Sequence, residues 1–256
     1  MNLPFTMFVV SDLHLEFCRV CMEKYVKLMP KKDLLILAGD IGLPNRKHFS
    51  KFLELVSKKY NTVIYVPGNH EYYSKFIDEK IEEICLKFGI IMLQNDFIYY
   101  ENVAFIGSTL WTNLKNQENN DLMEKDLIKM NDFHIIPWMN INKWKDLHNT
   151  SINFIEKTLR ELPKDKIAIV ITHHAPSYLF IPDLYKGENL NGCFASSLEY
   201  LFKYDNLKTW IAGHTHKSMC IYENNTLLYS NPGRKPNYDF YIDWFYQQDD
   251  TWNNTI

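Results

Sequence analysis

The sequence predicts an α/β fold whose first part alternates strands and helices and whose second part is rich in strands. Near the N-terminus, three apolar runs alternate with segments of helical spacing, which predicts parallel strands joined by right-handed crossovers. From residue 90 onward the runs are short and their links tight, which indicates antiparallel hairpins. The chain has 256 residues, 46% of them hydrophobic, so one domain over 1–256 can bury a sizeable core.

The first part contains three expected strands and three expected helices. The strand runs consist of apolar and β-forming residues and stop at turn-forming ones; they lie at 6–10, 33–38 and 62–66. The helical segments place apolar residues three and four apart and lie at 19–29, 49–60 and 75–88. Pro30 and Gly89 mark the ends of the first and third helices.

The second part begins with short strands that we expect to form antiparallel hairpins, at 90–93, 97–100 and 103–107. Further strands are expected at 167–171, 209–212, 218–222, 226–230 and 238–246. Helices are expected at 149–162 and 198–204. Residues 110–147 form an irregular insertion. Such an insertion acts either as a lid or specificity loop, or as a surface excursion held by its tryptophans.

Composition narrows the class of protein. A net charge of -3 and a pI near 6.3 exclude a global attraction for nucleic acid or anionic membranes. Five irregularly spaced cysteines argue against a disulfide framework, and Cys18 and Cys21 lack the second pair that a zinc site needs. No signal peptide is recognisable, and no run reaches the about 18 apolar residues of a membrane span. A cytoplasmic protein is expected.

Six of the nine histidines lie in five polar motifs, and each motif ends or follows an apolar run. The motifs are Asp12-Leu13-His14, Gly39-Asp40, Gly68-Asn69-His70-Glu71, His173-His174-Ala175-Pro176 and Gly213-His214-Thr215-His216. In extended backbone, residues two apart share a face. We therefore expect Asp12 and His14 to point at one ion, and His214 and His216 to form a chelating pair. Asp, Asn and His ligands suit Mn, Fe, Zn or Ni.

In this order and with these separations, the motifs resemble those of the calcineurin-like metallophosphoesterase superfamily over roughly residues 5–229. The resemblance implies a four-layer αββα sandwich of two mixed β-sheets flanked by helices. Gly107-Ser108-Thr109-Leu110-Trp111 and Asn131-Asp132-Phe133 are similar to a bacterial-type branch of the family.

The resemblance also implies two divalent metal ions and assigns their ligands. These are Asp12, His14 and His216 for the first ion, Asn69, His173 and His214 for the second, and Asp40 as the bridge between them. A carboxylate suits the bridging position because its two oxygens can serve ions about 3.5–4 Å apart. A hydroxide between the ions is then the expected nucleophile, attacking phosphorus in line with the leaving oxygen.

His70 is expected to protonate the leaving oxygen or stabilise its charge rather than to bind metal. Glu71 either orients His70 or Asn69, or caps the following helix, and we favour the cap. Some relatives carry a second acid a few residues after the Gly-Asp motif. This chain has Ile41-Gly42-Leu43-Pro44 there, so a carboxylate partner for His70 must come from elsewhere.

Three further choices concern the rim of the site. Alignment of the strand ends favours His173 as the ligand and leaves His174 in a supporting or substrate-facing position. Arg234 is either a phosphate contact or an ordinary surface arginine beside a turn. The aromatic residues near the motifs either belong to the core or stack a nucleobase; they are Tyr72, Tyr73 and Trp111.

The function expected from these motifs is a metal-dependent phosphohydrolase that prefers phosphodiesters and acts on a small phosphoester or a nucleotide. One alternative is a non-catalytic scaffold on the same fold, which typically loses ligand residues, whereas none is lost here. The other is a nuclease acting on DNA or RNA, and the lack of a basic tract argues against it. Substrate choice is expected to lie in 110–147 and 177–192.

Overall fold

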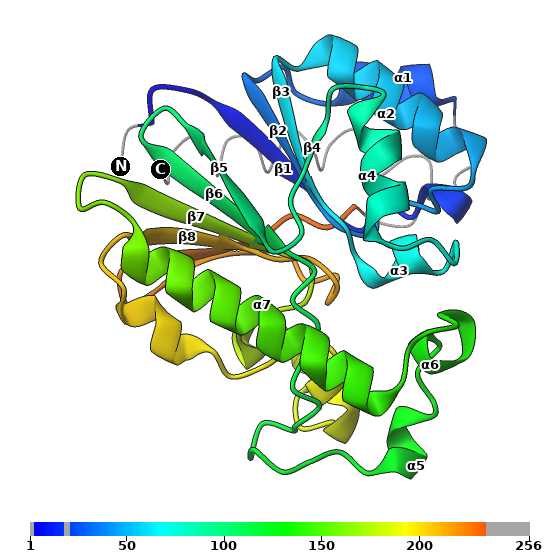
Figure 1. Cartoon of the computed structure of the whole chain (residues 1–256), viewed down its shortest axis with the longest axis vertical. Coiled ribbons are helices and arrows are strands. Elements are labelled where there is room, and N and C mark those ends of the chain that lie inside the picture. The colour runs from blue at the N-terminus through cyan, green and yellow to red at the C-terminus, as the bar shows by residue number, and fades with distance from the viewer. Residues whose placement is uncertain (1–2, 18–20, 234–256) are drawn as a thin grey trace.

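The computed structural model describes residues 3–17 and 21–233 and contains two β-sheets that face each other, with helices on their outer faces (Figure 1). The predicted sandwich of two sheets flanked by helices is confirmed. Among the earlier expectations, Cys18, Arg234 and the strand at 238–246 lie outside the described residues. Within the described ranges, no helix combines the length and apolar character needed to cross a membrane.

The first sheet has four strands in the order β1-β2-β3-β4, and its pairs are all parallel. The strands are β1 (Met7–Val10), β2 (Leu34–Ala38), β3 (Thr62–Val66) and β4 (Ile91–Met92). The segments between them are η1 (Leu15–Phe17), α1 (Met22–Leu28), α2 (Lys47–Lys59), α3 (Asn69–Tyr72) and α4 (Asp78–Leu86). The predicted alternation of parallel strands and helices is therefore confirmed.

The expectation of antiparallel pairing for residues 90–93 was wrong. β4 pairs in parallel with β3, with Ile64 opposite Ile91 and Tyr65 opposite Met92. The physical reason is that α4 is a crossover connection, which brings the chain back in the same direction as β3. The short link after β4 then carries the chain into the second sheet, where β5 (Asp96–Tyr100) and β6 (Val103–Ser108) form the hairpin.

The second sheet has six strands in the order β5-β6-β7-β8-β10-β9. Its remaining strands are β7 (Ile167–Thr172), β8 (Leu207–Ile211), β9 (Met219–Glu223) and β10 (Thr226–Ser230). The inner strands pair in parallel, and the two edge strands, β5 and β9, pair antiparallel with their neighbours. Both strand directions thus occur in this sheet.

The long helix of the second part starts earlier than the sequence predicted. α7 spans Ile141–Glu161 instead of beginning near 149. Asn140 caps it by accepting a hydrogen bond from the Lys143 amide at 2.9 Å. Trp144 and His148 are buried on the same helix as Ile155, so the apolar stripe continues back into the expected insertion. The irregular segment therefore ends at Asn140.

The other helical turns of the second part are short. They are α5 (Glu124–Leu127), α6 (Asp132–Ile135), η2 (Tyr178–Phe180), η3 (Asp183–Tyr185), η4 (Asn189–Cys193) and η5 (Glu199–Lys203). The helix expected at 198–204 is thus present as the 3₁₀ turn η5.

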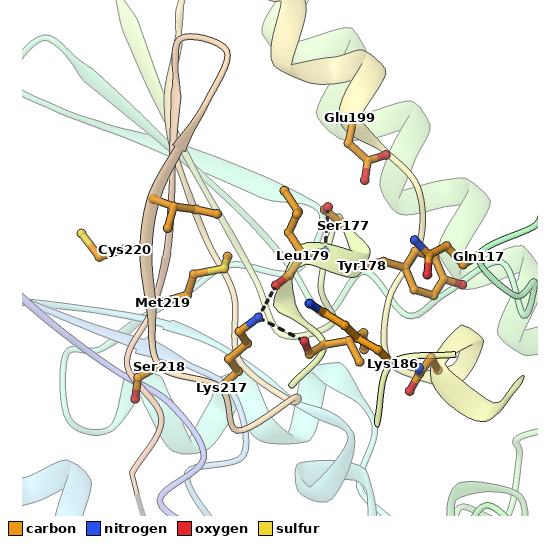
Figure 2. A pocket seen from close by; sticks show the side chains of 13 residues that line it. Gln117, Ser177, Tyr178, Leu179, Lys186, Glu199, Lys217, Ser218, Met219 and Cys220 are labelled. Atoms are coloured by element: carbon orange, nitrogen blue, oxygen red, sulfur yellow. Dashed lines mark hydrogen bonds between the residues drawn. The ribbon is translucent and has the colours of Figure 1, made fainter. Parts of the chain in front are cut away.

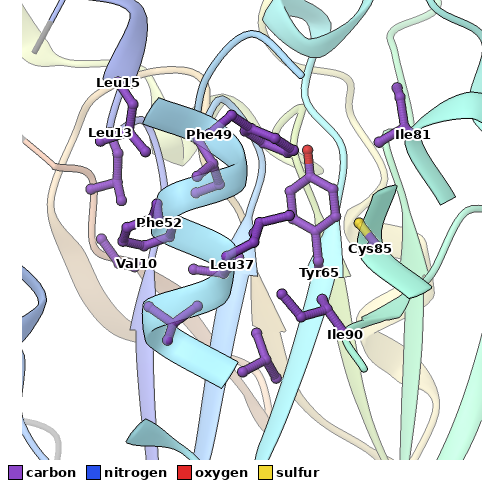
Figure 3. Close-up of a cluster of buried hydrophobic side chains, with 14 of the residues drawn as sticks. Val10, Leu13, Leu15, Leu37, Phe49, Phe52, Tyr65, Ile81, Cys85 and Ile90 are labelled. Atoms are coloured by element: carbon purple, nitrogen blue, oxygen red, sulfur yellow. The ribbon is translucent and has the colours of Figure 1, made fainter. Parts of the chain in front are cut away.

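Three apolar layers hold the sandwich together, because alternate residues of each strand point to opposite faces. Val9 of β1 and Ile171 of β7 belong to the layer between the sheets. Val10 packs with Phe52 and the other residues under the helices of the first sheet, as Figure 3 shows. Val170 packs under α7 on the outer face of the second sheet. The strands are thereby held so that the motif loops meet at one edge.

Candidate metal centre

The loops that carry the five motifs are joined by hydrogen bonds. The Asp12 amide donates to the carbonyl oxygen of Gly39 and the His14 amide to that of Asp40, both at 2.9 Å. The Gly213 amide donates to the His173 carbonyl oxygen at 3.0 Å. The His214 amide donates to Asp12 Oδ1, also at 2.9 Å, which joins the two groups of loops. Motifs from both sheets therefore form one continuous site.

The backbone at the site is not extended, contrary to expectation. Five motif residues have φ between 47° and 65°: Asp12, His14, Asp40, His214 and His216. Asp and His tolerate this left-handed region better than most residues, although each such position costs about 1–3 kcal/mol. The physical reason is that β1 and β8 end before these residues, so the chain is turning where a straight strand was expected.

Two glycines allow the loops to approach closely. Gly39 has φ +85°, and a Cβ atom there would lie 2.3 Å from His173 Nδ1. A Cβ atom on Gly68 would lie 2.2 Å from Asp40 Oδ1. The glycines of the Gly-Asp and Gly-Asn-His motifs are therefore needed for space around the ligand-type side chains, and at Gly39 also for the backbone conformation.

Ligand-type atoms form three overlapping groups, each with its atoms within 4.8 Å of one another. The groups are Asp12, His14 and His216; Asp40, His173 and His214; and His14, Asp40 and His70. His214 and His216 thus enter different groups, so the expected chelating pair is wrong, because the turning backbone directs the two rings apart. His216 is 42% exposed and His70 24%, so the site opens to solvent at these two residues.

Asp40 lies between the groups. Its Oδ1 is 3.3 Å from His173 Nε2, whereas its Oδ2 is 3.7 Å from His14 Nε2. Burial alone would raise the pKa of Asp40, but the neighbouring histidines, His173 and then His70, hold it well below its usual value. The carboxylate is therefore ionised, with its two oxygens facing different sets of ring nitrogens.

This set of donors fits divalent ions. His14 Nε2 and His216 Nε2 lie 3.2 Å apart and face each other. His214 Nε2 is buried without a hydrogen-bond partner among the described residues, which is costly unless something else occupies it. Oxygen and imidazole donors of this kind suit Mn, Fe, Zn or Ni.

Asn69 presents its amide oxygen to the second group. Oδ1 lies 3.1 Å from His173 Nε2, and Nδ2 donates to Asp132 Oδ1 at 2.8 Å. In the sequence analysis, Asp132 appeared only within Asn131-Asp132-Phe133, a segment similar to a branch of the family, and no role was assigned to it. No spacing rule relates it to Asn69, which lies 63 positions earlier.

The two adjacent histidines follow β7, and their ring centroids lie 5.4 Å apart, but the two rings have different hydrogen-bond partners. His173 Nδ1 donates to the Ala38 carbonyl oxygen at 3.1 Å, which leaves Nε2 facing Asp40. His174 is fully buried, with its ring centroid 5.1 Å from that of Trp111. Its Nδ1 donates to the Thr109 carbonyl oxygen. Of the two positions that the sequence left open for His174, the structure has the supporting one, behind the site.

Glu16 is a site residue that the sequence reasoning missed. Its Oε1 lies 3.0 Å from His70 Nδ1 and 3.2 Å from His14 Nδ1. Burial lowers the pKa of His70, but Asp40 and Glu16 together raise it to about 9. The available signal was its position two residues after His14, in the series Asp12, His14, Glu16. His70 therefore has a carboxylate partner, although no second acid follows Asp40.

Glu71 is buried and joins two motif loops. It accepts a hydrogen bond from the Gly68 amide at 2.7 Å and so caps α3, a short helix that contains Glu71 itself and that the sequence did not predict. It also accepts from the amides of Asp40 at 3.0 Å, Ile41 at 2.8 Å and Gly42 at 3.3 Å. It is therefore a cap that in addition holds the Gly-Asp loop.

The aromatic residues near the motifs divide into two kinds. Tyr72 and Trp111 are buried, with ring centroids 5.8 Å apart, so both belong to the core. Tyr73 is half-buried, and its ring centroid lies 4.4 Å from that of His70. Among these three residues, Tyr73 is thus the one placed beside the open side of the site.

The chain is similar in sequence to known proteins. The family model for calcineurin-like phosphoesterases matches residues 5–218. An uncharacterised protein of Acanthamoeba polyphaga mimivirus is 33% identical over 254 residues, covering 87% of this chain and 88% of that protein.

Two solved structures share the fold. Phosphopantetheinyl hydrolase from Mycobacterium tuberculosis has a TM-score of 0.73 and 15% identity, with 95% of this chain and 92% of that one covered. A Staphylococcus aureus protein provisionally assigned as a 5'-nucleotidase has a TM-score of 0.53 and 14% identity, with 90% and 48% covered.

Proposed function

The chain belongs to the calcineurin-like phosphoesterase family and is a metal-dependent phosphoester hydrolase, and from this premise we propose that it holds two ions and prefers phosphodiesters. The observation that carries the proposal is the position of Asp40, with one oxygen toward His173 and the other toward His14. A carboxylate between two sets of donors is suited to bridging two ions.

We assign the ligands by the groups in which their atoms lie. The first ion takes Asp12, His14 and His216, the second takes His173, His214 and the Asn69 amide oxygen, and Asp40 serves both. When bound, the ions would supply a water of lowered pKa and neutralise charge on the phosphate. The exposed edges of His216 and His70 mark the side from which the phosphate enters.

His70 is the proposed acid for the leaving oxygen. Its Nδ1 donates to Glu16, so Nε2 is the nitrogen left for the substrate. The His70 amide donates to Asp40 Oδ1 at 2.9 Å, which ties the acid to the bridging carboxylate. A protonated imidazole fixed in this way can transfer its proton as the phosphorus–oxygen bond breaks.

A pocket formed mainly by residues 177–191 and 217–221 supports the preference for diesters (Figure 2). It has a volume of about 660 Å³, and Lys217, which directly follows His216, is one of its walls. The Lys217 ammonium group donates to the carbonyl oxygens of Leu179 at 2.8 Å and Ile181 at 3.1 Å, so this wall is held in place. The pocket offers room for the second ester group that a diester carries and a monoester lacks.

The same pocket draws its walls from both segments expected to determine substrate choice. Gln117 comes from the irregular segment after β6, whereas Ser177 and Asn191 come from the segment after β7. The relatives that share the fold are named for different phosphoesters, a phosphopantetheinyl group and a 5'-nucleotide. We therefore propose a small phosphoester or nucleotide as the substrate class.

The proposal is tested by comparing bis(p-nitrophenyl) phosphate with p-nitrophenyl phosphate in the presence of Mn²⁺. We expect turnover of both, a higher kcat/KM for the diester, two metal ions per chain by elemental analysis, and loss of activity in Asp40→Asn. No turnover of either ester by folded, metal-loaded protein would overturn the hydrolase assignment. A ratio that favours the monoester would overturn the diester preference alone.

A further inference from the structure

We propose that Asp132 is a positioning residue for the metal centre, which fixes the Asn69 amide so that its oxygen faces the ion. The inference rests on the proposed function, in which Asn69 is a ligand. Asn69 Nδ2 donates to Asp132 Oδ1 at 2.8 Å, and the two residues are 2% and 1% exposed. The hydrogen bond is therefore shielded from competing water.

The orientation of Asn69 matters because the two ends of an amide group have nearly the same shape but opposite chemistry. The oxygen has lone pairs that can bind a metal, whereas the NH₂ group only donates. Asp132 Oδ1 accepts this hydrogen bond, and only the NH₂ end of the Asn69 amide can donate it, so Asp132 selects that end. The oxygen is then turned to the opposite side, where it lies 3.1 Å from His173 Nε2.

Tyr73 makes a weaker contact with the same end of the amide. Its hydroxyl lies 3.4 Å from Asn69 Nδ2, which is a longer contact than the 2.8 Å to Asp132. The Tyr73 hydroxyl also makes a hydrogen bond with Asp132, so it is held against the same carboxylate. Of these two partners of Asn69 Nδ2, Asp132 thus makes the shorter hydrogen bond.

Asp132 comes from the irregular segment, where it starts the short helix α6. The next residue, Phe133, stacks on Trp144 of α7, with ring centroids 5.2 Å apart. The segment is therefore anchored on the long helix at the point where it reaches the metal centre. The sequence suggested two roles for this segment, a lid or a surface excursion. The structure adds a third, because the segment supplies the residue that holds a proposed ligand in place.

The first test measures metal binding directly. We expect Asp132→Asn and Asp132→Ala to bind one of the two Mn²⁺ ions about 10- to 100-fold more weakly by calorimetric titration, with the other ion unchanged. Asp132→Asn has nearly the same shape as the original residue, so it separates this effect from misfolding, which thermal unfolding monitors. Asp121→Asn is the matched control: it lies in the same segment, is 66% exposed and pairs with Lys145.

A reciprocal exchange provides the second test. In Asn69→Asp with Asp132→Asn, the donor and acceptor change places, so the hydrogen bond is retained and one carboxylate oxygen still faces the ion. We expect this double variant to bind the weakened ion more tightly than either single variant. Asn69→Asp alone places two carboxylates in contact, which is unfavourable. A residue that acted only by filling space would show no such recovery.

Wild-type metal affinity in folded Asp132→Asn, or an exchange variant no better than the single variants, would overturn the inference. Failure of the proposed function has a different signature, namely a wild-type protein that binds both ions but hydrolyses neither ester. In that case the titrations still decide whether Asp132 positions Asn69.

Discussion

Glu16 Oε1 lies 3.0 Å from Nδ1 of His70 and 3.2 Å from Nδ1 of His14, so one carboxylate oxygen contacts both rings. The side chain is 7% exposed, and its other oxygen is buried without a hydrogen-bond partner among the described residues. Because a carboxylate at one ring nitrogen sets the tautomer and orientation of the imidazole, Glu16 prepares the opposite nitrogen of His70 for proton transfer.

Replacing Glu16 with glutamine is therefore expected to slow the reaction according to the leaving group. With saturating Mn²⁺, kcat for a diester of a poor leaving group such as phenol should fall about 10- to 100-fold, because its departing oxygen needs a proton. The p-nitrophenyl ester should be affected less. Glu83→Gln, on the exposed side of α4, is the matched control. Equal losses on both esters would contradict a role through His70.

His70→Gln separates proton donation from metal binding. The ring lies in a group with His14 and Asp40, so geometry alone would also permit it to be a ligand. We expect kcat for poor leaving groups to fall about 100-fold or more, while elemental analysis still finds two ions per chain. His48→Gln, on an exposed part of α2, should change neither quantity. Loss of an ion from the His70 variant would instead assign it as a ligand.

Glu71→Gln should destabilise the protein. Each Glu71 oxygen accepts two backbone amides: Oε1 those of Ile41 and Gly42, and Oε2 those of Asp40 and Gly68. Whichever way the new amide turns, its NH₂ end faces two backbone N–H donors. We therefore expect the free energy of unfolding to fall by about 2 kcal/mol or more. Urea unfolding of the metal-free protein measures it, with exposed Glu79→Gln as the control. An unchanged free energy of unfolding would refute the role.

Metal-free protein should lose stability as the pH rises. Burial lowers the pKa of His173 and His70, but Asp40 raises each to about 9, above the unfolded value of about 6.5. The bound protons therefore stabilise the fold fully below about pH 6.5, and this contribution disappears as the pH passes about 9. Thermal unfolding after EDTA treatment should show Tm falling across this range, with a shallower fall in His70→Gln.

Metal binding should show the opposite trend over the same range. A ring nitrogen must lose its proton before it binds an ion, so the affinity for Mn²⁺ should increase from about pH 6.5 to about pH 9. Titrations in buffers of different ionisation enthalpy would detect the released protons. A Tm that rises with pH in the metal-free protein would contradict both expectations.

The order and chemistry of the motifs could be predicted from the sequence because they depend on local patterns. An apolar run such as Thr62–Val66, followed by Pro67 and Gly68, defines both a strand and the turn that ends it. Parallel strands place such ends at one edge of a sheet. The meeting of the motifs at one edge could therefore be predicted before any contact between them was known.

Tertiary structure decided which side chains meet within that edge. The partner of His70 is 54 positions earlier, and the partner of Asn69 is 63 positions later. It also decided that His214 and His216 separate, because a turn with positive φ replaced the expected strand. These outcomes depend on how distant loops pack against each other. A pattern of neighbouring residues indicates local backbone preference but contains no information about that packing. The sequence by itself therefore determined which chemical groups are available at the site, and the tertiary structure determined which of these groups contact one another.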